Sequence, residues 1–153
     1  MTILTRLKVQ LIFTVVLFGL AACYPAPHDR HFQATSPYDF NETMQNLDIA
    51  ISEFNYRIIH RSEIGQAVRD RGEDDFPLST IVSFCNITHA REMMLINDDL
   101  INDMPCNVAV RETTDGVIVS TRLMDETAGS DTQQAFARKI NINLKKIIGA
   151  TTL

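Results

Sequence analysis

The chain has 153 residues, of which 45% are hydrophobic and 22% charged, so it has room for one globular domain and is not a disordered chain. Its formal net charge is −5, and residues 1–22 carry two basic residues and no acidic one, so their removal makes it −7. An acidic surface repels phosphate backbones, and aromatic residues make up only 7% with no tryptophan for stacking. The composition therefore argues against nucleic acid as a partner.

Residues 1–22 have the layout of a signal peptide. Arg6 and Lys8 form a positively charged start, and a mostly apolar stretch from Val9 to Leu20 follows. Such a length is typical of a signal-peptide core and is shorter than the ~20 residues that a membrane-spanning helix needs. We therefore expect residues 1–22 to be removed on export.

The stretch ends in Leu20-Ala21-Ala22-Cys23, which resembles the bacterial lipobox. The cysteine of a lipobox receives a diacylglyceryl group, and two or more acyl chains hold a protein stably at a bilayer. Cys23 is therefore the predicted lipidation site, and the lipoprotein is expected in the cell envelope, anchored to the membrane and facing the periplasm. Tyr24 stands where an aspartate would favour the inner membrane, so it favours the outer one. The alternatives are an ordinary secretory signal and a retained membrane helix.

Residues 23–36 are expected to form a lipidated tether, because the segment contains prolines and shows no hydrophobic periodicity. His28 and His31 lie close together in it. Two histidines on a flexible linker have no fixed geometry, so solvation is the simpler interpretation and no metal site is predicted there. The predicted domain covers residues 37–150.

The first half of this domain predicts two helices and two strands. Asp39 or Asn41 can cap a first helix that ends at Asn55. The apolar positions of this helix, which recur at helical spacing, are Met44, Leu47, Ile51 and Phe54. The pattern then predicts a short strand at 56–60, a minor helix at 64–71 and a buried strand at 78–85.

The second half predicts a helix at 88–96, strands at 108–110 and 117–123 joined by the turn Thr114-Asp115-Gly116, and a long amphipathic helix at 131–148. Helices and strands alternate irregularly and include a hairpin. This order favours an α+β fold with a single, mostly antiparallel sheet packed by helices over a doubly wound parallel sheet. The predicted core residues are Leu47, Ile51, Phe84, Val108, Val119, Phe136 and Leu144.

Three short motifs stand at the junctions of these elements: Asp39-Phe40-Asn41-Glu42-Thr43, Phe84-Cys85-Asn86, and Met104-Pro105-Cys106-Asn107-Val108-Ala109-Val110 before the Asp115-Gly116 turn. Together they resemble the domain of unknown function 302 family over about residues 36–125. Members usually have Asn-Pro after the first cysteine, whereas Ile87 follows Asn86 here. The resemblance implies one sheet with helices on a face, an architecture related to the TATA-box-binding protein. That relation is one of fold and implies no DNA binding.

Cys85 and Cys106 are the only two thiols left once Cys23 is lipidated. Each lies at the end of a predicted strand, so we expect the two at adjacent strand ends, close enough to interact. Three alternatives remain open: a structural disulfide formed in an oxidising compartment, two reduced thiols packed as small apolar side chains, and a functional thiol site. Cys85 also precedes a helix, whose N-terminus lowers the pKa of a thiol.

His89 follows Cys85 by one helical turn and is a weak candidate metal ligand. Two cysteines and one histidine do not complete a tetrahedral zinc site. Met93, Met94 and Met104 could add thioether ligands for copper(I), but methionines on an apolar helix face are more often core residues. No metal or cofactor is therefore predicted.

Familiar catalytic motifs, such as a glycine-rich phosphate loop or a nucleophile elbow, do not occur in the sequence. The sequence accordingly predicts a non-catalytic binding module for a small molecule or a protein. The alternative is a thiol-dependent redox or sulfur-handling protein that uses Cys85 and Cys106.

Overall fold

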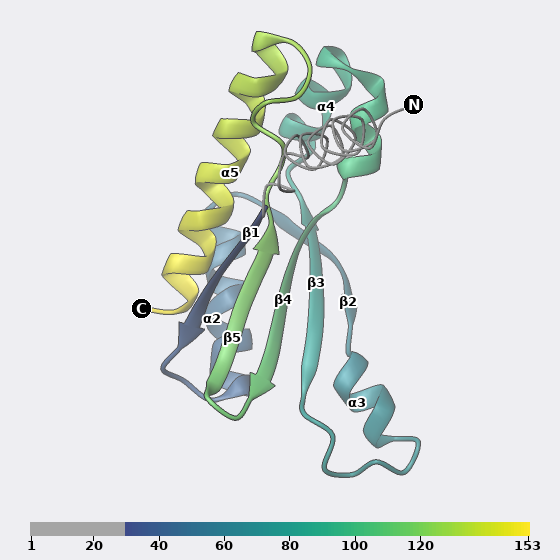
Figure 1. The fold of residues 1–153 in the computed structure, drawn as a ribbon, viewed down its shortest axis with the longest axis vertical. Helices are drawn as coiled ribbons and strands as arrows, with labels where there is room; N and C mark the ends of the chain where they lie inside the picture. Colours follow the sequence, from purple (N-terminus) through teal and green to yellow (C-terminus); the bar gives the residue numbers. More distant parts are fainter. Residues whose placement is uncertain (1–29) are drawn as a thin grey trace, which may run out of the picture.

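The computed structural model describes residues 30–153, which form one five-stranded sheet with helices packed on it (Figure 1). In chain order the elements are β1 (His31–Ser36), α2 (Phe40–Glu53), β2 (Arg57–Ser62), α3 (Ile64–Arg69), β3 (Ser79–Cys85), α4 (Ile87–Ile96), the 3-10 helix η2 (Asp98–Asp103), β4 (Cys106–Thr113), β5 (Gly116–Arg122) and α5 (Asp131–Thr151). The strands are ordered β1-β5-β4-β3-β2, and every neighbouring pair is antiparallel. The predicted α+β class with a single antiparallel sheet is confirmed.

The core lies between one face of the sheet and the helices α2 and α5, which pack against each other (Figure 1). Alternate residues of β3, β4 and β5 point into it, as the two-residue period of a strand requires. All seven predicted core residues are buried, none with more than 3% of its surface exposed. Helices α4 and η2 lie at one end of the sheet and α3 at the other (Figure 1).

Side-chain caps fix where the main helices begin. The Asp39 side chain accepts a hydrogen bond from the Glu42 amide at 2.9 Å and so starts α2, which settles the choice between Asp39 and Asn41. Ser130 caps α5 in the same way. The predicted hairpin turn is also confirmed, because Thr113 pairs with Gly116 across it. Gly116 has φ +118°, a conformation that favours glycine.

The predicted tether is wrong over its last six residues, because His31–Ser36 forms the edge strand β1. This strand pairs along its whole length with β5, from His31 opposite Arg122 to Ser36 opposite Val117. Phe32 and Ala34 pack against the core at alternate positions, a pattern too short and too weakly apolar to stand out among the prolines of the segment. The domain therefore begins before residue 37, and its last helix continues to Thr151.

Residues 1–29, with the predicted signal peptide, Cys23 and His28, lie outside the described residues. Within residues 30–153, none of the helices combines the length and apolar character needed to cross a bilayer. Export and lipidation consequently remain predictions from the sequence.

Candidate functional site

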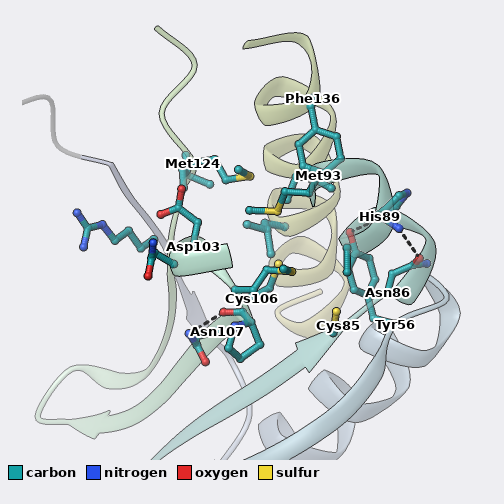
Figure 2. A pocket seen from close by; sticks show the side chains of 18 of the residues that line it. Tyr56, Cys85, Asn86, His89, Met93, Asp103, Cys106, Asn107, Met124 and Phe136 are labelled. Carbon is teal, nitrogen blue, oxygen red and sulfur yellow. Dashed lines mark hydrogen bonds between the residues drawn. The ribbon is translucent and has the colours of Figure 1, made fainter. Parts of the chain in front are cut away.

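A cavity of about 230 Å³ opens at the end of the sheet where β3 stops and β4 starts. Its walls come from these strand ends, from α4 and η2, from the segment after β5 and from α5 (Figure 2). Phe136, Ile140 and Leu144 of α5 form an apolar side, and Asn86, Asn102 and Asn107 add polar groups. The cavity has the mixture of an apolar lining and a few polar groups that is typical of small-molecule sites.

Sulfur atoms concentrate in this lining. Residues 30–153 contain seven cysteines and methionines, and five of them line the cavity. The five are Cys85, Met93, Met104, Cys106 and Met124. Met44 and Met94 are the two that do not. Figure 2 shows the side chains of Met93, Cys106 and Met124 directed into the same space between the strand ends and α5.

The strand register places the two cysteines next to each other in the sheet. Cys106, the first residue of β4, is paired with Phe84, and Cys85 follows Phe84 as the last residue of β3. Both thiols are free and partly buried. The structure shows no disulfide between them and places both at the cavity, while the role of the pair stays a prediction.

Burial makes both thiols weakly acidic. It raises the pKa of Cys106 to about 11, with a smaller upward contribution from the negative charge that Cys85 would carry. Burial also raises the pKa of Cys85. This direction is opposite to the lowering expected from the start of α4, and its cause is burial, which disfavours the charged thiolate. At pH 7 a thiol with a pKa of about 11 is ionised in about one molecule in ten thousand.

The free energy of unfolding is expected to fall as the pH rises from 9 to 11. In this interval Cys106 keeps its proton in the folded chain but loses it in the unfolded chain, whose thiol has its ordinary pKa of 9.0. The stabilisation is present below pH 9 and is lost as the pH passes 11, with a size of at most about 3 kcal/mol. Urea unfolding across this range, with Cys106→Ala as the control that lacks the group, measures it. Parallel declines in the two proteins would contradict the expectation.

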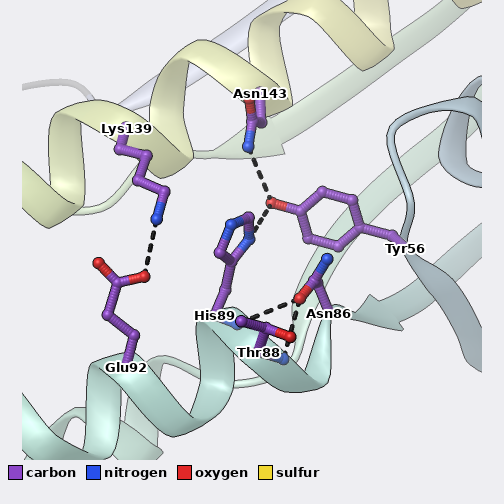
Figure 3. A network of polar contacts seen from close by, with 7 residues as sticks. All are labelled: Tyr56, Asn86, Thr88, His89, Glu92, Lys139 and Asn143. Carbon is purple, nitrogen blue, oxygen red and sulfur yellow. Dashed lines mark hydrogen bonds and ion pairs between the residues drawn. The ribbon is translucent and has the colours of Figure 1, made fainter.

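Asn86 connects the end of β3 to α4 and thereby sets the position of one cavity wall. Its side-chain oxygen accepts hydrogen bonds from the amides of Thr88 at 3.0 Å and His89 at 3.1 Å, which caps α4 (Figure 3). Its side-chain nitrogen donates to the Asn55 carbonyl at 2.8 Å. The cap therefore holds α4, and with it His89 and Met93, at a fixed angle to the strand that ends in Cys85.

Tyr56 and His89 form a polar contact at the cavity that links α4 to α5. Asn143 of α5 donates a hydrogen bond to the Tyr56 hydroxyl at 3.3 Å, and the hydroxyl lies 3.3 Å from Nδ1 of His89 (Figure 3). The hydroxyl can then donate its own proton only if Nδ1 of His89 is unprotonated. Burial lowers the pKa of His89, with a further lowering from Lys139, which agrees with a neutral ring.

The contact with Tyr56 bears on His89 as a candidate metal ligand. His89 does line the cavity, but its Nδ1 atom is engaged by Tyr56. Among residues 30–153 the structure brings together no group of three His, Cys, Asp or Glu side chains that could hold a metal ion. Neither Tyr56 nor Asn143 was a predicted site residue, because they are 87 positions apart in the chain and so leave no local pattern.

The fold and the cavity define a small α+β domain with a sulfur-lined pocket at one end of its sheet. Residues 32–151 match a family described as "Domain of unknown function DUF302", and the chain belongs to this family. Its structure is similar to that of an uncharacterized conserved DUF302 protein from Bacillus stearothermophilus, with a TM-score of 0.72 at 15% identity over 80% of this chain and 98% of that one. No curated protein matches the sequence.

Proposed function

We propose that the domain is a non-catalytic binding module whose ligand occupies the sulfur-lined cavity. The main support for this proposal is the cavity, which has a volume of about 230 Å³. Its lining combines an apolar wall with five sulfur-containing side chains and several side-chain amides. An apolar cavity of about 150 Å³ is large enough for benzene, so this one has room for a small bicyclic molecule.

Thiol-dependent redox chemistry is the second candidate, and the adjacency of Cys85 and Cys106 at the cavity supports it. Thiol–disulfide exchange needs a thiolate as the attacking group. Since burial raises the pKa of both thiols, the thiolate is scarce near neutral pH. The acidity of the pair therefore favours binding over exchange chemistry.

We further propose that a lipid at Cys23 holds this domain in the cell envelope, facing the periplasm and most simply at the outer membrane. The first described residue, Arg30, lines the cavity, and its carbonyl accepts a hydrogen bond from the Leu123 amide at 2.7 Å. Seven residues, 24–30, separate Cys23 from β1 and can span at most about 25 Å. A lipid anchor at Cys23 would thus keep the cavity end of the domain close to the membrane surface.

Filling the cavity is expected to abolish binding of a small apolar probe. Ala90 of α4 lines the cavity and is half-buried, so Ala90→Phe places a ring in the space that a ligand would occupy. Indole serves as the probe, and amide chemical shifts of the ¹⁵N-labelled protein report where it binds. We expect saturable shifts at Cys106 and at cavity-lining residues of α4 in the parent protein, and none in Ala90→Phe.

The matched control is Ala67→Phe, because Ala67 is exposed on α3 at the other end of the sheet. This variant should bind indole as the parent does. Thermal unfolding of both variants establishes that they are folded. Shifts that persist in Ala90→Phe, or that map to another surface, would contradict the proposed site.

A further inference from the structure

The sulfur atoms of the cavity come from parts of the chain that only the fold brings together. Cys85 ends β3, Met93 lies on α4, Met104 follows η2, Cys106 begins β4 and Met124 follows β5. Met93 is buried in the core, and Met104, Cys106 and Met124 pack against it, so these side chains line the cavity at the margin of the hydrophobic core. The concentration of sulfur at one place points to a ligand that sulfur recognises.

The donor atoms select the class of that ligand. Thiolate and thioether sulfur are soft ligands, and thioethers suit copper(I), whereas Mg²⁺ and Ca²⁺ require oxygen donors. A structural zinc site needs four Cys, His or carboxylate ligands, and within residues 30–153 no three such side chains are placed so that they could hold a metal ion together. His89 and Asp103 also line the cavity but do not form such a group with the cysteines, and the three remaining sulfur donors are thioethers, which favours copper(I) over zinc.

We propose that the cavity binds one copper(I) ion, with the sulfur atoms of Cys85 and Cys106 as thiolate ligands and the thioether sulfur of Met93 as a third ligand, to which Met104 or Met124 can add a fourth. The inference rests on the proposed function, since it names the ligand of the same cavity. Each thiol gives its proton to solvent as the copper–sulfur bond forms. The ion stays copper(I) throughout, so the step needs no oxidant or reductant.

Charge and solvent at the cavity agree with this ligand. One monovalent ion with two thiolates carries a net charge of −1, and the charged residues that line the cavity, Arg30, Arg122 and Asp103, together carry +1 and offset that charge. Phe136, Ile140 and Leu144 exclude water from one side of the cavity. An apolar wall of this kind limits access of solvent to a metal centre.

The test is a competition titration of the full chain carrying Cys23→Ser, so that Cys85 and Cys106 are its only thiols. The protein is purified in detergent under anaerobic, reducing conditions, and copper(I) is supplied as its complex with the chromophoric chelator bathocuproine disulfonate. We expect one ion to transfer per chain. Cys85→Ser and Cys106→Ser should each weaken binding at least 100-fold.

The methionines supply the sharper comparison, because Met→Leu changes the volume of a side chain little and removes only its sulfur. Met93→Leu should weaken copper(I) binding about tenfold, whereas Met94→Leu, one residue further along α4, should stay within twofold of the parent. Copper X-ray absorption should show three or four sulfur neighbours. Two neighbours together with no difference between the two leucine variants would overturn the cavity site.

Separate control measurements test whether each variant is folded and whether the cavity binds a small molecule. Thermal unfolding is recorded for each variant, and Cys106→Ala replaces Cys106→Ser if the serine variant does not fold. A folded parent that binds indole at the cavity but takes no copper(I) from the chelator overturns the copper inference and leaves the binding function standing. A folded parent that binds neither probe overturns both.

Discussion

Replacing Phe84 with alanine is expected to lower the free energy of unfolding by about 3–5 kcal/mol, because the substitution leaves a cavity in a tightly packed core. The Phe84 side chain is completely buried, and its ring packs edge-on against Tyr56 with 5.4 Å between the ring centres. The change removes this aromatic contact as well as apolar burial. Urea unfolding followed by circular dichroism measures the loss.

Ile81→Ala on the same strand is the matched control. Ile81 points to the opposite face of the sheet from Phe84 and is only half-buried, so its truncation should cost clearly less. Equal losses in the two variants would contradict the placement of the core on the helix side of β3. Because Tyr56 also contacts His89, Phe84→Ala should in addition weaken indole binding at the cavity.

Replacing Cys23 with alanine is expected to abolish incorporation of a fatty-acid analogue completely, because the thiol is the only group at the lipobox that can receive the diacylglyceryl chain. The chain should then remain unprocessed or be recovered without a lipid anchor. The measurement is metabolic labelling with an alkyne fatty acid in a bacterial host, followed by gel fluorescence and intact mass.

Cys106→Ala controls for the loss of a thiol as such and should keep full labelling. Lipid labelling that persists in Cys23→Ala would overturn the anchor. It would also remove the reason to place the cavity near a membrane surface, while the binding experiments on the described domain would be unaffected.

Most secondary structure could be predicted from the sequence because its signals are local. The apolar spacing of α2 and α5 and the Asp115-Gly116 turn each depend on residues within a few positions of one another. β1 could not be predicted in this way. An edge strand of six residues is stabilised by its partner β5, which lies about 85 positions further along the chain.

The candidate site was partly predictable. The positions of Cys85 and Cys106 at strand ends led to the expectation that they are neighbours, and the register of β3 and β4 confirms that they lie at adjacent positions. Their acidity was not predictable, because the sequence shows that Cys85 precedes a helix but not how far its thiol is withdrawn from water. Desolvation depends on which other elements cover the group.

The sequence by itself determined most of the helices and strands, the core residues and the predicted lipid anchor, since each is encoded in spacing or in a short motif. The tertiary structure alone decided that β1 belongs to the domain and that Met93, Met104 and Met124 meet the two cysteines at one cavity. It also decided that Tyr56 reaches both His89 and Asn143. These contacts join residues that are far apart in the chain. Strand register and helix packing bring the residues together, and no local sequence pattern reveals such long-range contacts.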